Sequence, residues 1–345
     1  MKINNSRIVW VDLTKSLAIF MVIIIHSIAS LFYEYSSSPF SKNFILSNFI
    51  NSFFRVAVPL FILLSGVLVL QNTMPIEKLW HKVKRLLIPL IFWSILYKYW
   101  VYYNIGKKFN IFSILNSIIH EPAMYRLEFV YYMLGVCLLF PILALIVNEM
   151  IKDTKFACYF LILWFVINSV NSYYFLSITN WMAISNFLNY SGYAVLGAYL
   201  IRKNIGLKFP IYYWLILYLI GSIITFIITW KLNINSSVPD ETAYVYLTPN
   251  VIIASIEICV VLQKVNVQVY YNKLLKCISN NCFFIYFFHV LVIEKLKVQI
   301  LVIPILNPIY SPIIGSLILG IATFIISLLI SILIRLIPHA QKLVG

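Results

Sequence analysis

The sequence has few charged side chains, few cysteines and no long polar segment. Charged residues make up 11% of the 345 residues and hydrophobic residues 62%, against about 25% and about 45–50% in a soluble domain. This composition excludes a water-soluble enzyme, a disordered chain and a nucleic-acid-binding protein. The five cysteines form no CxxC pair. We therefore interpret them as packing residues, and we expect neither a disulfide framework nor a metal site.

Long apolar runs fill the chain instead, and the mean hydropathy is +0.92. One transmembrane helix needs about 20 apolar residues. The expected helices are roughly 9–31, 45–70, 86–104, 129–148, 155–176, 184–201, 210–230, 245–262, 279–294 and 309–334. The predicted fold class is therefore an all-α polytopic membrane protein with about ten transmembrane helices. We expect a single membrane domain over residues 1–345, with no separate soluble domain.

The net charge of +15 could indicate a polyanionic partner, so the distribution of the basic residues matters. If the N-terminus is cytoplasmic, the segments on the inner side hold 16 basic residues and those on the outer side hold 7. This bias follows the positive-inside rule. It predicts that both termini are cytoplasmic, and it favours membrane topology over polyanion binding as the cause of the charge.

The first apolar run contains three ionisable side chains, Asp12, Lys15 and His26. At about 100° per residue, all three fall on one stripe of a helix. Charged groups in a span are costly and usually face the protein interior or a cavity, so this stripe is a candidate site. Lys15 can also neighbour Asp12 at a spacing of i, i+3, which would offset the burial of both charges.

His26 is the candidate general base. It lies 19 residues beyond Arg7, about 28 Å along a helix, which places it near the outer end of a membrane core about 30 Å thick. An imidazole suits the activation of a hydroxyl near neutral pH. The alternative is a histidine that only hydrogen-bonds a neighbouring helix. Asp12 lies about 21 Å from His26, too far to orient its imidazole.

Basic residues also cluster in the segment His81–Pro89, which we interpret as a loop at the inner face. Lys82, Lys84 and Arg85 suit either a positive-inside anchor or a clamp for the phosphates of a nucleotide. Other ionisable residues within the predicted spans, to which the sequence assigns no role, are Arg55, Lys98, Glu257 and His289.

These residues resemble the motifs of a known family. The opening segment with Asp12, Lys15 and His26 resembles the first-helix signature of the acyltransferase-3 membrane proteins. Lys82 and Arg85 resemble the two basic positions of the family's RxxR segment. Further similar segments, in family order, are Phe54–Leu70, Tyr131–Leu143, Gly192–Leu200, Tyr246–Ile256 and Asn280–Ile293. The ordered set is most similar to the short WecH-type O-acetyltransferases.

The resemblance implies an enzyme of the bacterial cytoplasmic membrane. Such enzymes transfer an acetyl or other acyl group from cytoplasmic acyl-CoA to a hydroxyl of an envelope polysaccharide or glycolipid. It implies a catalytic role for His26 and Asp12, and it implies that Lys15, Lys82 and Arg85 bind the CoA donor. Lys82 departs from the family's arginine, keeping the charge but losing the bidentate fork.

A second departure is Arg126-Leu-Glu128, where many relatives have His-Leu-Trp. Glu128 would be an additional carboxylate near the outer side. We interpret it as a second acid/base group or as a ligand of a sugar hydroxyl. The alternative is a surface ion pair with Arg126.

The competing function class is a transporter or flippase for an envelope glycan or a small solute, because buried charges and proline-interrupted spans also suit that class. Such proteins commonly contain inverted repeats, and no internal repeat is recognisable here. A third class is a membrane scaffold or sensor. The ordered motifs favour the enzyme.

Overall fold

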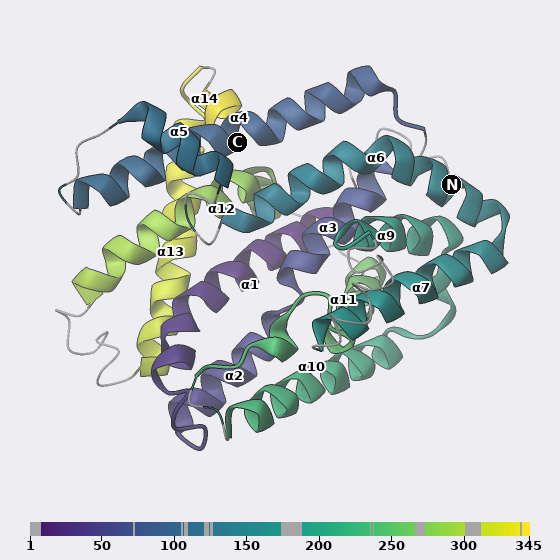
Figure 1. Cartoon of the computed structure of the whole chain (residues 1–345), viewed down its shortest axis with the longest axis horizontal. Coiled ribbons are helices and arrows are strands. Elements are labelled where there is room, and N and C mark those ends of the chain that lie inside the picture. The colour runs from purple at the N-terminus through teal and green to yellow at the C-terminus, as the bar shows by residue number, and fades with distance from the viewer. Residues whose placement is uncertain are drawn as a thin grey trace.

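The computed structural model describes residues 8–345 except 72, 105, 107–109, 121–123, 125–126, 174–187, 235, 237, 266–272, 301–311 and 339. This part of the chain is helical and contains no strand (Figure 1). The helices are α1 (Val9–Glu34), α2 (Lys42–Phe54), α3 (Ala57–Val69), α4 (Ile76–Asn104), α5 (Ile111–His120), α6 (Glu128–Lys152), α7 (Thr154–Ser172), α9 (Ser191–Lys203), α10 (Ile211–Ile234), α11 (Pro249–Lys264), α12 (Lys273–Ile300), α13 (Pro312–Ile334) and α14 (Ala340–Val344). Two short 3-10 turns, η2 (Ile205–Lys208) and η3 (Thr242–Tyr244), precede α10 and α11.

The prediction of an all-α polytopic membrane protein is confirmed. Within the described residues, nine helical segments are long and apolar enough to cross a membrane, with α2 and α3 counted together. The one predicted span that is not among these nine segments, 184–201, corresponds to α9, which begins at Ser191 and has 13 residues. Residues 184–187 lie outside the described part. The cytoplasmic location of both termini stays a prediction.

The predicted helix over 45–70 is wrong in one respect, because it is broken at Arg55 and Val56. Pro59 has no N–H, so the Arg55 carbonyl lacks its donor four residues on and the ladder of hydrogen bonds is interrupted. Pro59 itself lies in the first turn of α3, where its N–H would have no partner within the helix. The break leaves Arg55 in the turn between α2 and α3.

The interpretation of His81–Pro89 as a loop is also wrong. Helix α4 begins at Ile76 and runs without interruption to Asn104. Residues 76–88 contain no glycine or proline and are rich in Leu, Lys, Arg and Glu, which favour helix even where they are polar. A further helix, α5, lies between α4 and α6.

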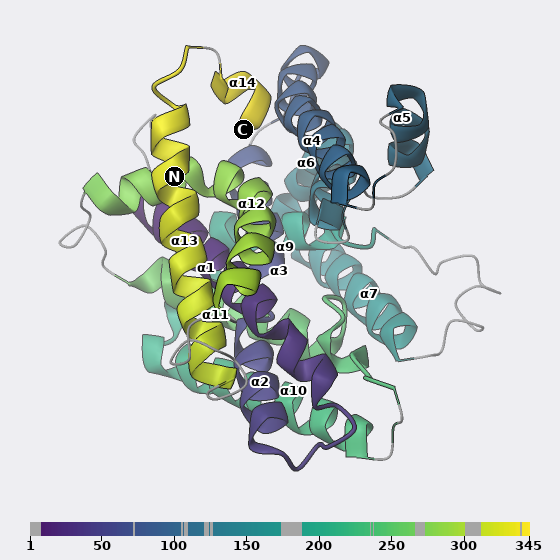
Figure 2. The same cartoon turned by 90° about the vertical axis from the view of Figure 1, so that its left-hand side faces the viewer.

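Helix α1 lies at the centre of the bundle. It packs against α2, α3, α11, α12 and α13, and α13 crosses it in Figure 2. In the most apolar stretch of α1, 67% of the residues are buried, against 17% in α10, which forms the edge of the molecule opposite α4 in Figure 1. Polar side chains on α1 are therefore surrounded by protein, whereas α10 presents most of its surface to lipid.

Two glycines allow α3 and α9 to pack backbone against backbone. A Cβ atom on Gly66 would lie 1.8 Å from the carbonyl oxygen of Ala194, and one on Gly197 would lie 2.4 Å from that of Leu63. Small residues at a crossing point are typical of closely packed membrane helices. This contact fixes the position of α3, which begins at Ala57, two residues after Arg55.

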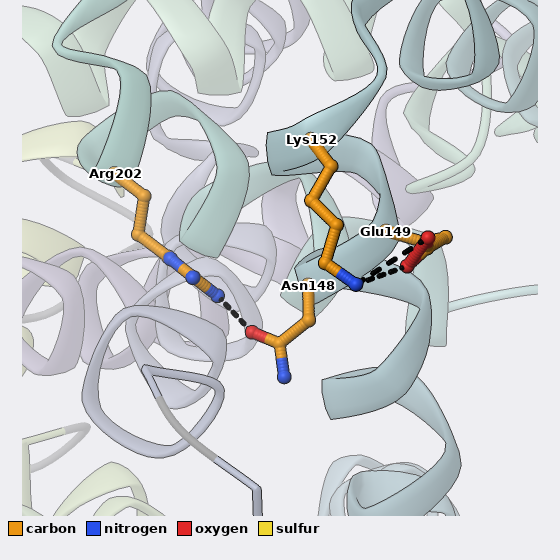
Figure 3. A network of polar contacts seen from close by, with 4 residues as sticks. All are labelled: Asn148, Glu149, Lys152 and Arg202. Atoms are coloured by element: carbon orange, nitrogen blue, oxygen red, sulfur yellow. Dashed lines mark hydrogen bonds and ion pairs between the residues drawn. The ribbon is translucent and has the colours of Figure 1, made fainter.

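The C-terminal ends of α6 and α9 meet in a polar contact (Figure 3). Arg202 of α9 donates from Nη1 to Asn148 Oδ1 of α6 at 2.7 Å and to the carbonyl oxygen of Leu70 at 3.5 Å. The neighbouring pair Lys152–Glu149, at 2.9 Å, is exposed and contributes little to stability. Arg202 thus joins three helices at this end of the bundle.

Candidate active site

One cavity of about 90 Å³ brings together polar side chains from five separate parts of the chain. Besides tyrosines, the ionisable residues that line it are His26, Arg55 and Glu128. The other lining residues are Val22, Ile25, Ala57, Val58, Phe129, Tyr132, Tyr246 and Tyr286. His26 and Glu128 are two of the six predicted site residues. The cavity therefore combines a potential base, a carboxylate and a cation within an aromatic wall.

His26 is half-buried on α1 and stacks against a second histidine. The ring centroids of His26 and His289 are 5.4 Å apart, with 23° between the ring planes. His289 is completely buried on α12, and its Nδ1 lies 2.5 Å from the carbonyl oxygen of Tyr286. Because a carbonyl only accepts, Nδ1 of His289 carries a proton. This hydrogen bond fixes the ring that lies against His26.

The sequence assigned no role to His289, because its depth relative to His26 follows only after a tertiary contact has aligned α1 with α12. Asp12 and Ser279 are in contact, so α1 and α12 can be aligned at that point. His26 lies about 21 Å beyond Asp12 and His289 about 15 Å beyond Ser279. Two helices that start together and carry histidines at similar depth can bring them into contact.

Arg55 lies in the turn between α2 and α3. Its Cζ lies 4.9 Å from the ring centroid of Tyr244 and 4.9 Å from that of Tyr246. Its Nε donates to the carbonyl oxygen of Tyr244 at 2.7 Å. The sequence left Arg55 without a role because neither its position in an apolar run nor its spacing predicts the break that exposes it to the cavity.

Glu128 is the first residue of α6 and also lines the cavity. Glu128 Oε2 accepts a hydrogen bond from Tyr132 Oη at 3.1 Å. The Tyr132 ring in turn stacks on Tyr190, with centroids 4.5 Å apart. Arg126, the alternative partner expected for Glu128, lies outside the described residues. Glu128 thus has a tyrosine hydroxyl as a partner and a cavity beside it.

Asp12 lies in a different place, deep between α1 and α12. Ser279 Oγ donates to Asp12 Oδ1 at 2.5 Å, and both side chains are buried. Helix α1 is continuous from Asp12 to His26, so the two remain about 21 Å apart. Lys15, one turn further along α1, is half-buried. The structure therefore separates Asp12 and Lys15 from the cavity that holds His26.

Lys82 and Arg85 lie in the first turns of α4 and do not line the cavity. Lys82 is half-buried and Arg85 is exposed. Arg335, just beyond α13, donates to the carbonyl oxygen of Asn280 at 2.5 Å. Burial lowers the pKa of the Arg335 guanidinium, and the nearby charge of Arg85 lowers it further. Arg85 and Arg335 therefore lie near the starts of α1 and α12, away from His26.

Among the described residues, no three His, Cys, Asp or Glu side chains are grouped as ligands of a metal ion. The side chains that line the cavity offer an imidazole, a carboxylate, a guanidinium and tyrosine hydroxyls. Such a set can move a proton, hold a hydroxyl group and stabilise a negative charge.

Comparison with known families shows which family the chain belongs to. Residues 8–334 match the acyltransferase domain of the acyltransferase-3 family. The chain belongs to the acyltransferase-3 family. No curated protein and no solved structure matches it. This acyltransferase-3 protein is thus a multi-pass membrane acyltransferase, and the matched range includes every residue that lines the cavity.

Proposed function

We propose that this acyltransferase moves an acyl group, with acetyl as the expected one, from cytoplasmic acyl-CoA to a hydroxyl of an envelope polysaccharide or glycolipid. We place it in the bacterial cytoplasmic membrane and group it with the WecH-type O-acetyltransferases. The observation that best supports the proposal is that His26 and Glu128, more than 100 residues apart in sequence, line one cavity. A base and a carboxylate in one cavity suit a hydroxyl substrate.

In the proposed reaction, His26 removes the proton from the acceptor hydroxyl. The hydroxyl oxygen attacks the thioester carbon, the new C–O bond forms, and the C–S bond breaks. The CoA sulfur leaves with the proton that His26 had taken, so the imidazole ends neutral. In the alternative order, His26 first carries the acyl group as an acyl-imidazole and then passes it to the acceptor.

Glu128 and the tyrosines would hold the acceptor. The Glu128 carboxylate can accept a hydrogen bond from a sugar hydroxyl in addition to the one from Tyr132. The rings of Tyr132, Tyr246 and Tyr286 line the same cavity and offer flat apolar faces with polar rims. This combination suits a sugar ring, which has apolar faces and hydroxyls at its edge.

The donor would bind at the opposite end of the bundle through Lys15, Lys82 and Arg85. Arg85 lies near Arg335, and two neighbouring guanidinium groups suit the phosphates of CoA. The pantetheine arm would then extend along α1 toward His26, a distance of about 21 Å from the level of Asp12. Asp12, held by Ser279, would organise this donor end.

The test uses purified protein in lipid vesicles with radiolabelled acetyl-CoA and p-nitrophenyl-β-D-glucoside as the hydroxyl probe. We expect label to move to the glucoside, or to appear slowly as acetate. We expect His26→Ala to abolish both reactions but still to bind acetyl-CoA. The matched control is His120→Ala, because His120 is an exposed histidine on α5 that does not line the cavity.

Retained transfer by His26→Ala would remove His26 from the mechanism. A wild-type protein that neither binds nor turns over acetyl-CoA would reject the acyl-CoA-dependent reaction. The transporter or flippase class would then be tested next.

A further inference from the structure

The Arg55 guanidinium is held at three points. Tyr244 and Tyr246 each place a ring 4.9 Å from its Cζ, and Nε donates to the Tyr244 carbonyl oxygen. Cation–π contacts restrain a planar guanidinium in position, and the hydrogen bond restrains its rotation. A group that is already restrained loses little conformational entropy when a ligand binds. Arg55 is therefore pre-organised.

The two clamping tyrosines are themselves anchored by three helices. Tyr244 Oη donates to Asn48 Oδ1 of α2 at 2.5 Å, and Asn48 Nδ2 donates to the carbonyl oxygen of Phe226 in α10 at 3.1 Å. Tyr193 Oη of α9 donates to the carbonyl oxygen of Tyr246. The clamp therefore moves only if α2, α9 or α10 moves, which gives Arg55 a rigid support.

The remaining donors of Arg55 have no partner in the described part of the protein. A guanidinium has five N–H bonds, and Nε uses one of them. The four N–H bonds of the two terminal NH₂ groups form no hydrogen bond with a described residue. Arg55 and Glu128 line the same cavity but form no ion pair with each other. A fixed cation with four open donors beside His26 is arranged for negative charge that arrives with the substrate.

We propose that the terminal NH₂ groups of Arg55 donate hydrogen bonds to the acyl carbonyl oxygen while acyl transfer takes place. This inference rests on the proposed function, and it makes Arg55 a catalytic residue beside His26. Pre-organised donors aimed at developing negative charge are among the largest contributions to enzymatic rates.

The step involves only groups already named. When the acceptor oxygen attacks the thioester carbon, the carbonyl π pair moves onto the carbonyl oxygen, and Arg55 binds that oxyanion. The pair returns to re-form C=O as the C–S bond breaks, and the sulfur takes the proton from His26. Arg55 keeps its charge throughout, and no oxidant, reductant or further reactant is needed.

The experiment compares wild type, His26→Ala, Arg55→Gln and Arg55→Lys in lipid vesicles with radiolabelled acetyl-CoA. Lys231→Gln is the matched control, because Lys231 is an exposed cation on α10 outside the cavity. Three reactions are followed: hydrolysis, transfer to p-nitrophenyl-β-D-glucoside and transfer to the acidic p-nitrophenyl-β-D-glucuronide. The melting temperature and acetyl-CoA binding of each variant are measured in parallel.

The oxyanion forms whether water or a sugar attacks, so Arg55→Gln should lower the kcat of hydrolysis and of transfer equally. Loss of one oxyanion donor lowers kcat about 100- to 1,000-fold, and acetyl-CoA binding should not change. Arg55→Lys keeps the charge without the planar fork and should recover only part of the loss. Lys231→Gln should match wild type.

Hydrolysis at the wild-type rate in Arg55→Gln would overturn the inference. If only transfer to the glucuronide then fell, Arg55 would bind an acidic acceptor instead. If Arg55→Gln does not fold, a folded Arg55→Lys with full hydrolysis overturns the inference equally well. If turnover is lost in His26→Ala but kept in Arg55→Gln, the inference about Arg55 is rejected and the proposed function stands. If the wild-type protein is inactive, both the proposed function and the inference about Arg55 are rejected.

Discussion

Gly66 lies where α3 crosses α9, and its replacement by alanine would force two backbones apart. A Cβ atom there would lie 1.8, 2.5 and 2.7 Å from the carbonyl oxygen, carbonyl carbon and Cα of Ala194. All three are backbone atoms, so no side chain can rotate away to make room. On the α9 side of the same crossing, a Cβ atom on Gly197 would lie 2.4 Å from the carbonyl oxygen of Leu63, which is also too close.

The size of the effect follows from these distances. The new Cβ would have to move about 1.6 Å from the Ala194 oxygen to reach an ordinary contact distance. Overpacking a well-packed interior costs about 1–3 kcal/mol, and we expect the upper end because backbone must move. Since Ala57 and Val58 in the first turn of α3 line the cavity, the displacement should also lower acyl transfer.

The assay is thermal unfolding in detergent, followed by size-exclusion chromatography and by turnover of acetyl-CoA. Gly135→Ala is the matched control, because a Cβ on Gly135 of α6 meets nothing within 4 Å. Alanine in a helix interior is more stable than glycine by about 1 kcal/mol, so Gly135→Ala should melt at or above the wild-type temperature. If Gly66→Ala has the same melting temperature as wild type, the close packing of α3 on α9 is refuted.

Three further substitutions test other parts of the site. Glu128→Gln keeps an acceptor for Tyr132 but loses the negative charge, so transfer to the glucoside should fall about tenfold while hydrolysis of acetyl-CoA stays at the wild-type rate. Equal losses in the two reactions would make Glu128 an acid/base group. His289→Phe keeps an aromatic ring against His26 but loses the hydrogen bond that holds the residue 289 ring in place. Turnover should therefore fall about tenfold, whereas acetyl-CoA binding should not change. Turnover at the wild-type rate would contradict this. Ser279→Ala removes the hydroxyl that donates to Asp12, so the free energy of unfolding should fall by about 1.5–3 kcal/mol, measured by thermal unfolding. Because Asp12 would organise the donor end, acetyl-CoA binding should weaken as well, and wild-type stability and binding would contradict this.

Much of the architecture was predictable because membrane spans are set by local composition. The apolar runs predicted the spanning helices, since each must satisfy its own backbone hydrogen bonds inside the bilayer. The errors arose where polar residues continue a helix beyond the apolar run, as at the start of α4, and where Pro59 interrupts a run that stays apolar throughout. Composition indicates which segments can be buried in lipid, whereas the position of a helix end depends on where the backbone hydrogen bonds stop.

The sequence by itself determined the fold class, the family and the inward-facing stripe of α1 that includes His26. Those conclusions depend on apolar length, motif order and helical period, which are local properties. Only the tertiary structure decided that His26 shares a cavity with Arg55 and Glu128 and stacks on His289. These relations depend on how α1, α6, α12 and the turn between α2 and α3 are placed in space, and close packing fixes that placement between residues far apart in the chain.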